Sequence, residues 1–422
     1  MKYRLKAIPY FIKKTFPAFR HRNYRLFWYG QGISLSGTWM QTTAQAWLVY
    51  ELTKSPFLLG LIGALQFTPV MLFSLVAGVY LDRFPKKKII LVTQTVSMVL
   101  ALLLTILVLS GAVQFWHIAV IVIILGFVNT LDMPTRQSFM IELVGKTHLT
   151  SAIALNSVTF NLARIIGPAV GGILIANFGI GFCFLFNALS FMAVIVTVHM
   201  IKNLKIRKEE TAVVRQTVMK EIKEGLAYIR SKAILFRPLL FVAIVSTFAI
   251  NFNVIIPVFA KTVLKTEAQG FGFLLSALGI GSVIGALTVA VYSHKLNQKF
   301  LIAAMPYSIS FAMILIGLSS NFYTASSFLI LLGISNIMFF TSVNSTLQLN
   351  SDPQFRGRVM SVYTMVFGGV TPIGNLFAGS VSGAWGGRAG FIVSAGVVVV
   401  LIGLCWMFLR SKKEIFKTTV DN

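Results

Sequence analysis

The sequence is poor in acidic residues, in cysteine and in charge altogether. Only 12 of its 422 residues are Asp or Glu, against 37 Lys or Arg, and charged residues make up 12% of the chain. Soluble globular domains carry roughly twice that share of charged residues. Hydrophobic residues make up 56% of the sequence, far more than the interior of a water-soluble protein of this length can hold. The composition therefore predicts a membrane protein.

The residue patterns of catalysis, metal binding and nucleotide hydrolysis are also missing. Cys183 and Cys405 lie inside apolar runs, which excludes a disulfide framework and a thiolate metal site. The five histidines are scattered, and neither H-E-x-x-H nor G-x-S-x-G occurs. Gly145-Lys146-Thr147 is similar to the end of a phosphate-binding loop, but Met140 stands where that loop needs its first glycine. The sequence predicts no enzyme, no ATP-driven pump, no metal and no cofactor.

Long apolar runs predict an all-α membrane protein. A spanning helix needs about 20 apolar residues, and several charge-free runs are long enough for two such helices. These long runs contain turn signals at Ser110–Gly111, Asn177–Gly179, Ser319–Asn321 and Gly383–Arg388, where the chain must fold back. The count is twelve transmembrane helices, from the runs Phe27–Tyr50, Ser55–Leu81, Ile89–Leu131, Thr147–Ile201, Pro238–Ala260, Ala268–His294, Phe300–Ser351 and Val359–Leu409.

The placement of basic residues predicts the orientation in the membrane. With the N-terminus inside, 32 of the 37 Lys and Arg fall in inner segments and four in outer loops, while Arg164 lies inside a helix. Inner loops of membrane proteins carry such an excess of positive charge. We therefore expect a multi-pass protein of the bacterial inner membrane with both termini cytoplasmic. The net charge of +25 then reflects topology, and no nucleic acid partner is predicted.

The hydrophilic stretches divide the chain into two halves. Residues 1–26 form a basic amphipathic segment expected on the anionic cytoplasmic leaflet, without the pattern of a cleaved signal. Residues 27–201 and 238–409 are predicted to form two six-helix bundles. Residues 202–237 form a cytoplasmic linker with a surface helix, and residues 410–422 a cytoplasmic tail. Paired halves are typical of transporters that bind substrate at the bilayer midplane.

A loop motif after the second span resembles the signature of the major facilitator superfamily. Gly78-Val-Tyr-Leu-Asp82-Arg83-Phe-Pro-Lys-Lys87-Lys matches G-x-L-A-D-R-x-G-R-K at Gly78, Asp82, Arg83 and the bases including Lys87. The resemblance implies that Asp82 accepts hydrogen bonds from the start of the eleventh helix, near 357–361. It also implies that Arg83 pairs with Asp132 at the inner end of the fourth helix. The alternative is that Asp82 and Asp132 are solvated loop charges.

A second motif lies on the fifth span. Gly167, Pro168, Gly171 and Gly172 resemble the antiporter signature G-P-x-x-G-G, whose small residues let neighbouring backbones approach. The alternative is a packing bend without meaning for the direction of transport. The surrounding residues 161–168, and the run 132–136 that ends at Arg136, are similar to the enterobactin-exporter-like branch of the superfamily, which includes drug:proton antiporters.

Arg164 is the unusual residue of the transmembrane region. A guanidinium inside a span is unfavourable in hydrocarbon and normally faces a cavity or a partner. The sequence leaves two interpretations open: contact with an anionic substrate group, or structural hydrogen bonds to backbone carbonyls and to amides such as Asn161 and Asn187. Other intramembrane amides are candidates to line a substrate cavity: Gln41, Gln45, Asn129, Asn161, Asn251, Asn253 and Asn336.

These features together predict a secondary active transporter that works by alternating access. The family resemblance favours export of small amphipathic molecules, drugs or siderophore-like compounds, by proton antiport. With no acidic residue at the midplane, Asp132 beside Arg83 and Arg136 is the candidate for proton coupling. The expected partners are a small-molecule substrate, protons and the lipid bilayer, and we expect a monomer. A nutrient or lipid carrier of the same fold, a passive channel and a non-transporting membrane receptor are the alternatives.

Overall fold

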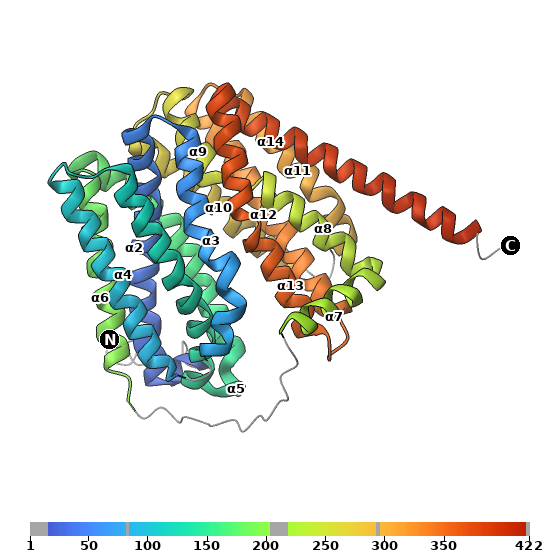
Figure 1. Cartoon of the computed structure of the whole chain (residues 1–422), viewed down its shortest axis with the longest axis horizontal. Coiled ribbons are helices and arrows are strands. Elements are labelled where there is room, and N and C mark those ends of the chain that lie inside the picture. The colour runs from blue at the N-terminus through green and yellow to red at the C-terminus, as the bar shows by residue number, and fades with distance from the viewer. Residues whose placement is uncertain (1–15, 82–83, 203–217, 293–295, 419–422) are drawn as a thin grey trace, which may run out of the picture. The chain divides into compact units, whose positions relative to one another are not determined.

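The computed structural model describes residues 16–81, 84–202, 218–292 and 296–418, apart from the side chains of 74–81, 146, 218–222 and 408–418 (Figure 1). The chain divides into two compact units. Unit 1 holds residues 1–52 and 68–215, and unit 2 holds residues 53–67 and 216–422. Every regular element in the described part of the chain is a helix. The bundle boundaries 27–201 and 238–409 stay a prediction.

Unit 1 is built from long helices that end at turn glycines. It contains η1 (Pro17–Arg20), α2 (Arg22–Thr53), the second half of α3 (Pro56–Leu81), α4 (Lys86–Leu109), α5 (Phe115–Phe178) and α6 (Ile180–His199). Gly111 and Gly179 have φ of 71° and 92°, a region open to glycine, and α4 and α5 end beside them as the turn signals predict. Helix α5 comprises two helices that meet at Gly145, whose φ is 71°.

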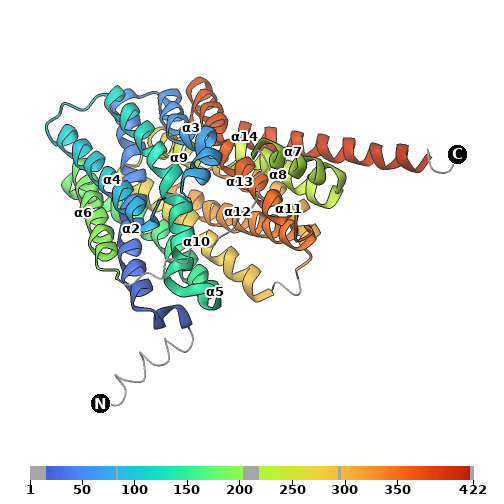
Figure 2. The same ribbon diagram turned by 60° about the horizontal axis from the view of Figure 1, so that its bottom comes forward.

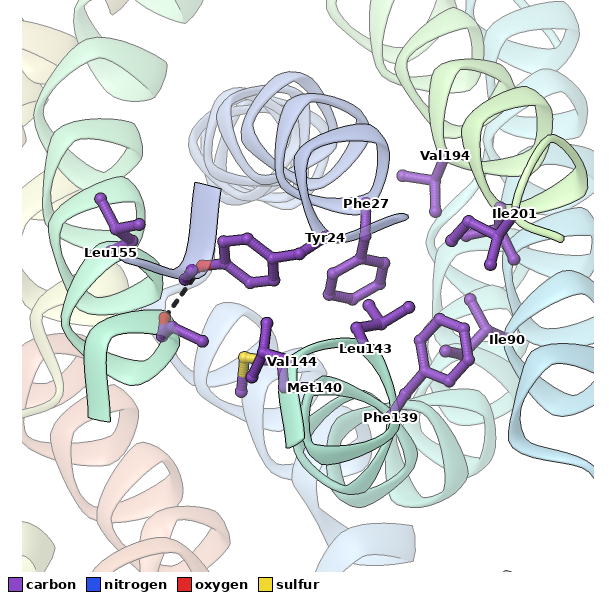
Figure 3. Close-up of a cluster of buried hydrophobic side chains, with 13 residues drawn as sticks. Tyr24, Phe27, Ile90, Phe139, Met140, Leu143, Val144, Leu155, Val194 and Ile201 are labelled. Carbon is purple, nitrogen blue, oxygen red and sulfur yellow. Dashed lines mark hydrogen bonds between the residues drawn. The ribbon is translucent and has the colours of Figure 1, made fainter. Parts of the chain in front are cut away.

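A cluster of buried apolar side chains holds one end of unit 1 together (Figure 3). Tyr24 and Phe27 of α2 point into it, and the Phe27 ring meets Phe139 of α5 edge-on at 5.5 Å between centroids. The Tyr24 hydroxyl donates to the carbonyl of Ala152 at 3.0 Å, which satisfies its polar end. Ile90 of α4 fills the space behind them. The cluster ties α2, α4, α5 and α6 into one body.

Unit 2 follows the same plan of long packed helices. Helix α12 packs against both α10 and α11, as the turned view also shows (Figure 2). Helix α14 breaks at Gly386, where φ is 84°. The helices are α7 (Val218–Ser231), α8 (Ala233–Phe248), α9 (Phe252–Thr262), α10 (Ala268–Tyr292), α11 (Gln298–Leu318), α12 (Phe322–Asn350), α13 (Arg356–Gly369) and α14 (Thr371–Thr418).

Residues 53–67, which contain the start of α3, also pack in unit 2. A Cβ on Gly60 would lie 2.3 Å from the Asn375 carbonyl oxygen, and one on Gly379 would lie 2.7 Å from the Pro56 carbonyl oxygen. These distances are too short for any side chain, so glycine is required at both positions. Helices α3 and α14 therefore touch backbone to backbone, which is the close packing that small residues permit in membranes.

The transmembrane helix count is confirmed. Ten stretches of the described chain are long and apolar enough to cross a membrane. One of them, Arg356–Met407, contains the break at Gly386 and so provides two spans. Helix α2, which is less apolar because of its amides and hydroxyls, is the remaining span. The protein is an all-helical membrane protein with twelve spanning helices.

Two details differ from the sequence prediction. The run Pro238–Ala260, predicted as one helix, is interrupted between α8 and α9 at residues 249–251, where the Asn251 side chain donates to the Thr247 carbonyl at 2.7 Å. Asp132 does not lie at a helix end, because the first part of α5 continues to Gly145. Burial of Phe139, Leu143 and Val144 stabilises that extension.

Candidate functional site

Asp132 of α5 is buried in unit 1 and fully engaged in hydrogen bonds. One carboxylate oxygen accepts from Thr93 Oγ1 at 2.6 Å and from Gln94 Nε2 at 3.2 Å, both on α4. The other accepts from Arg136 Nε at 2.5 Å, one turn along α5. The residue is 9% exposed, so it is not a solvated loop charge. The hydrogen bonds from Thr93 and Gln94 tie α4 to α5, the ion pair with Arg136 lies within α5, and Gln94 Oε1 has no partner in the described part of the chain.

The predicted loop motif is only partly within the described residues. Gly78 lies in α3, while Asp82 and Arg83 lie outside the described residues, so their contacts with 357–361 and with Asp132 stay a prediction. Lys87 donates to the carbonyls of His199 at 3.1 Å and Ile201 at 2.7 Å. These carbonyls mark the C-terminal end of α6, where a cation is favoured by the helix dipole.

Gly167 and Gly171 of the antiporter-like motif pack α5 closely against α2. A Cβ on Gly167 would lie 2.5 Å from Trp39 Cβ and 2.9 Å from the Ser36 carbonyl oxygen, which leaves no room for a side chain. A Cβ on Gly171 would lie 3.1 Å from Met40 Cγ. Pro168 and Gly172 are buried at the same stretch of α5. Gly167 and Gly171 therefore form a flat contact surface for α2.

Arg164 lies one turn before this surface, beside Trp39. Its guanidinium carbon is 5.8 Å from the centroid of the Trp39 ring, and that ring meets Phe160 edge-on at 5.6 Å. Asn161 donates instead to the Ser157 carbonyl of its own helix. Within the described part of the chain, Arg164 makes no hydrogen bond and no ion pair. The hydrogen bonds to Asn161 or Asn187 that one interpretation proposed are therefore not formed.

The amide candidates separate into three groups. Asn187 donates to Gln41 Oε1 at 2.6 Å, which makes Gln41 part of an α2–α6 contact. Asn129 and Asn253 are exposed. Gln45, Asn251 and Asn336 are buried, and Asn251 Oδ1 has no partner in the described part of the chain. A substrate cavity lined by these amides stays a prediction.

A polar cluster on unit 2 was not predicted from the sequence. Tyr228 of α7 stacks on Phe355, with 4.3 Å between centroids, and its hydroxyl accepts from Lys232 Nζ at 2.8 Å and from the Asp352 backbone at 2.9 Å. Lys232 also pairs with the Asp352 carboxylate at 3.1 Å. The hydrogen bond to Tyr228 and then the one to Asp352 raise the pKa of Lys232, and the hydrogen bond from Lys232 lowers the pKa of Asp352. A second pair, Arg358–Glu224 at 2.6 Å, also joins α7 to α13.

A histidine pair joins the start of unit 1 to α5. His21 Nε2 lies 2.9 Å from His148 Nδ1, and the nearby Ala18 amide donates to Ser151 Oγ at 3.3 Å. Burial, and then the positive charge of a protonated His148, lower the pKa of His21. Because neither histidine stands in a recognisable motif, this contact between residues far apart in the sequence could not be predicted.

Comparisons with known proteins agree with this architecture. The family model described as transmembrane secretion effector, a branch of the major facilitator superfamily, matches residues 13–418. The chain belongs to this family. The multidrug efflux pump Tap of Mycolicibacterium fortuitum is 23% identical over 387 residues, 90% of this chain and 94% of Tap. The staphyloferrin A transporter of Staphylococcus aureus is 23% identical over 386 residues, 90% of this chain and 94% of that one.

The fold of this family member is also that of solved transporters. The nucleoside transporter NupG superposes with a TM-score of 0.75 at 11% identity, covering 92% of this chain and 99% of NupG. At that identity the likeness concerns the fold alone. Membership of the transmembrane secretion effector family makes this protein a multi-pass membrane transporter of small molecules and not an enzyme.

Proposed function

We propose that this transporter exports small amphipathic molecules, drugs or siderophore-like compounds, by proton antiport. The observation that carries the proposal is the α2–α5 contact, in which Gly167 and Gly171 of an antiporter-like motif lie directly against Trp39 and Met40. Two relatives, each similar over nine tenths of the chain, are named as a multidrug efflux pump and a siderophore transporter. Export by this chain is consistent with both.

The proposed mechanism is alternating access controlled from the cytoplasmic side. We infer that Asp82 and Arg83 act as a latch that closes that side, with Asp132 and Arg136 behind it. Asp132 is our candidate for the proton-linked group, because its carboxylate is buried and already shared between α4 and α5. Protonation would cancel the charge that accepts hydrogen bonds from Thr93 and Gln94 of α4, and so would loosen the contact between the two helices. The protein would lie in a bacterial inner membrane with both termini cytoplasmic.

Transport into inside-out vesicles tests the proposal. Vesicles carrying wild type, Asp82→Asn or Asp132→Asn receive an imposed proton gradient, and the accumulation of the cationic dye ethidium and of the anionic dye carboxyfluorescein is followed by fluorescence. The matched control is Glu267→Gln, the same acid-to-amide change at an exposed pair with Lys261. We expect wild type and Glu267→Gln to accumulate dye until the gradient is collapsed, and the two Asp variants to lose most of that activity.

The opposite results are equally clear. Accumulation that persists after the gradient is collapsed would contradict proton antiport. Absence of accumulation by wild type across several amphipathic dyes, with the protein present in the membrane, would contradict drug export. The substrate would then be sought among siderophores, nutrients and lipids.

A further inference from the structure

Arg164 is an intramembrane cation whose hydrogen-bonding groups are unused. Its guanidinium has five N–H donors, yet it makes no hydrogen bond or ion pair with any residue that the structure describes. It makes a cation–π contact with Trp39, in which the guanidinium carbon lies 5.8 Å from the centroid of the ring. A cation over an aromatic ring is attracted to the ring face, and this contact uses none of its N–H groups as hydrogen-bond donors. Those N–H groups are therefore available to a ligand.

The side of α5 that carries Arg164 is its polar side. Ser157, Asn161 and Arg164 follow one another at spacings of four and three residues, so they share one face of the helix. The exposed apolar residues Leu162 and Ile166 lie on the opposite face, and the exposed ring of Phe160 borders the polar face. In a membrane the apolar face meets lipid, and the polar face meets water or substrate.

The neighbouring face of α2 has the same character. Thr38 and Thr42 are one turn apart and are accessible, with Trp39 beside them. The exposed apolar residues Tyr29 and Ile33 lie on the other side of α2. The polar faces of α2 and α5 therefore adjoin at Trp39, where Gly167 allows the two helices to meet.

We propose that Arg164, Trp39 and Phe160 form a subsite that binds the anionic group of an amphipathic substrate together with its apolar body. A guanidinium binds carboxylate and phosphate oxygens in pairs, which an ammonium cannot do. The Trp39 and Phe160 rings, 5.6 Å apart and edge-on, provide apolar contact next to that group. The ligand class is an organic carboxylate or phosphate joined to an aromatic or aliphatic body. This inference rests on the proposed function, since it names the substrate class of the same transporter.

The test uses three probes with one apolar body and different charge: 1-pyrenebutyrate, 1-pyrenebutanol and pyrenebutyl-trimethylammonium. Binding to the purified protein in detergent is measured by isothermal titration calorimetry, with protein-free micelles subtracted. We expect wild type to bind the carboxylate at least about tenfold more tightly than the alcohol, as one charge-assisted hydrogen bond allows. The cation should bind more weakly than the alcohol.

The variants separate charge from shape. Arg164→Gln should remove the preference for the carboxylate while the affinity for the alcohol stays unchanged, and Arg164→Lys should retain part of it. Trp39→Leu should weaken both the carboxylate and the alcohol. The control Lys299→Gln removes an exposed basic residue of unit 2 and should change nothing. A preference for the carboxylate that survives in Arg164→Gln would overturn the proposal, as would wild type without any preference.

The anionic group can belong to a soluble substrate or to a lipid headgroup, and a second experiment separates these sources. Pyrenebutyrate binding is repeated in nanodiscs of phosphatidylcholine with and without phosphatidylglycerol. Unchanged affinity assigns the subsite to a soluble anion. Competition by phosphatidylglycerol that disappears in Arg164→Gln assigns it to a lipid headgroup.

The outcome for this subsite is separate from that for export. Arg164-dependent binding without dye transport would support the subsite and contradict drug export. Dye transport with equal carboxylate affinity in wild type and Arg164→Gln would support export and overturn the subsite.

Discussion

At the scale of single residues, the buried charge of Asp132 is stabilised entirely by its neighbours. Its two oxygens accept three hydrogen bonds, from Thr93, Gln94 and Arg136. Removal of one partner from a buried pair leaves the other charge uncompensated, and this usually destabilises a protein by about 3–5 kcal/mol. Asp132 and Arg136 therefore depend on each other.

We expect Asp132→Ala to lower the free energy of unfolding of the purified protein by about 3 kcal/mol or more, because Arg136 then stays buried without its counter-charge. Thermal unfolding in detergent measures the change. The control is Glu142→Gln, which removes the half-exposed pair with Lys86 and should cost about 1 kcal/mol or less. Equal destabilisation by the two variants would contradict this account of Asp132.

The close contact at Gly167 leads to a prediction about packing. Gly167→Val would place methyl groups against Trp39 Cβ and the Ser36 carbonyl, so α5 and α2 must separate. Overpacking of this kind costs about 1–3 kcal/mol, and the displaced Trp39 should also reduce pyrenebutyrate affinity. Gly396→Ala is the control, because a Cβ at Gly396 meets no atom within 4 Å. If Gly167→Val unfolds at the same temperature as wild type, the contact does not hold the helices together.

At the scale of elements, α7 is attached to α13 by Tyr228 with its polar partners and by the Arg358–Glu224 pair. Tyr228 stacks on Phe355, and its hydroxyl meets Lys232 and the Asp352 backbone. We expect Tyr228→Ala to release α7 from α13, since an aromatic pair contributes about 0.5–1.5 kcal/mol beyond its buried area. Hydrogen–deuterium exchange of residues 223–232 should rise severalfold.

The variant Tyr228→Phe serves as the intermediate case, because it keeps the stacking and removes the hydroxyl. Its exchange should lie between wild type and Tyr228→Ala. Equal exchange in Tyr228→Ala and wild type would mean that the Arg358–Glu224 pair alone holds the helix.

The same attachment has a predicted pH range. The pKa of Asp352 is lowered from 3.8, so its contribution is full above pH 3.8 and is lost as pH falls through the lowered value. The pKa of Lys232 is raised from 10.5, so its contribution is full below pH 10.5 and is lost as pH rises through the raised value. The protection of the α7 amides from hydrogen–deuterium exchange, corrected for the intrinsic pH dependence of exchange, should therefore stay constant between about pH 5 and pH 9, because neither Lys232 nor Asp352 titrates there. A step near neutral pH that persists in Lys232→Met would contradict this assignment.

The contact of η1 with α5 should respond to mild acid. The pKa of His21 is lowered from 6.5, so the folded state favours the neutral ring. Its contribution is full above pH 6.5 and is lost as pH falls through the lowered value. We expect exchange of residues 17–24 to increase between about pH 6.5 and pH 5. His21→Gln, which cannot gain a proton in this range, should remove the pH dependence.

At the scale of the whole molecule, the orientation in the membrane can be tested with two matched alanines. Both natural cysteines are replaced first, since Cys183 is buried and Cys405 half-buried. Ala112, after α4, and Ala227, on α7, are both exposed. We expect Ala112→Cys to react with a membrane-impermeant maleimide in intact cells, and Ala227→Cys to react only after the cells are opened. The reverse pattern would place the termini outside.

Much of the architecture follows from local properties of the chain. Glycines at 111, 179 and 386 combine a positive φ with the end of an apolar run, so a turn was predictable at each of them. The break at Asn251 was not, because Asn251 and Pro257 occur within an apolar run that is long enough for one helix. The position of Asp132 inside a helix could not be predicted either. It depends on the burial of residues 139–144 in a core formed with other helices, which a single sequence does not reveal.

By itself, the sequence determined the class of protein, the number of spans, the expected orientation and the residues that are unusual in lipid. These follow from the sequence because the preference of a segment for lipid or water depends on its own hydrophobic and charged residues. Only the tertiary structure decided which of those residues meet. Trp39 lies beside Arg164 because Gly167 lets α2 and α5 touch. Thr93 of α4 donates a hydrogen bond to Asp132 of α5 because those two helices also pack together. Such contacts depend on the packing of residues far apart in the chain, and they turn a lone arginine into a candidate binding site.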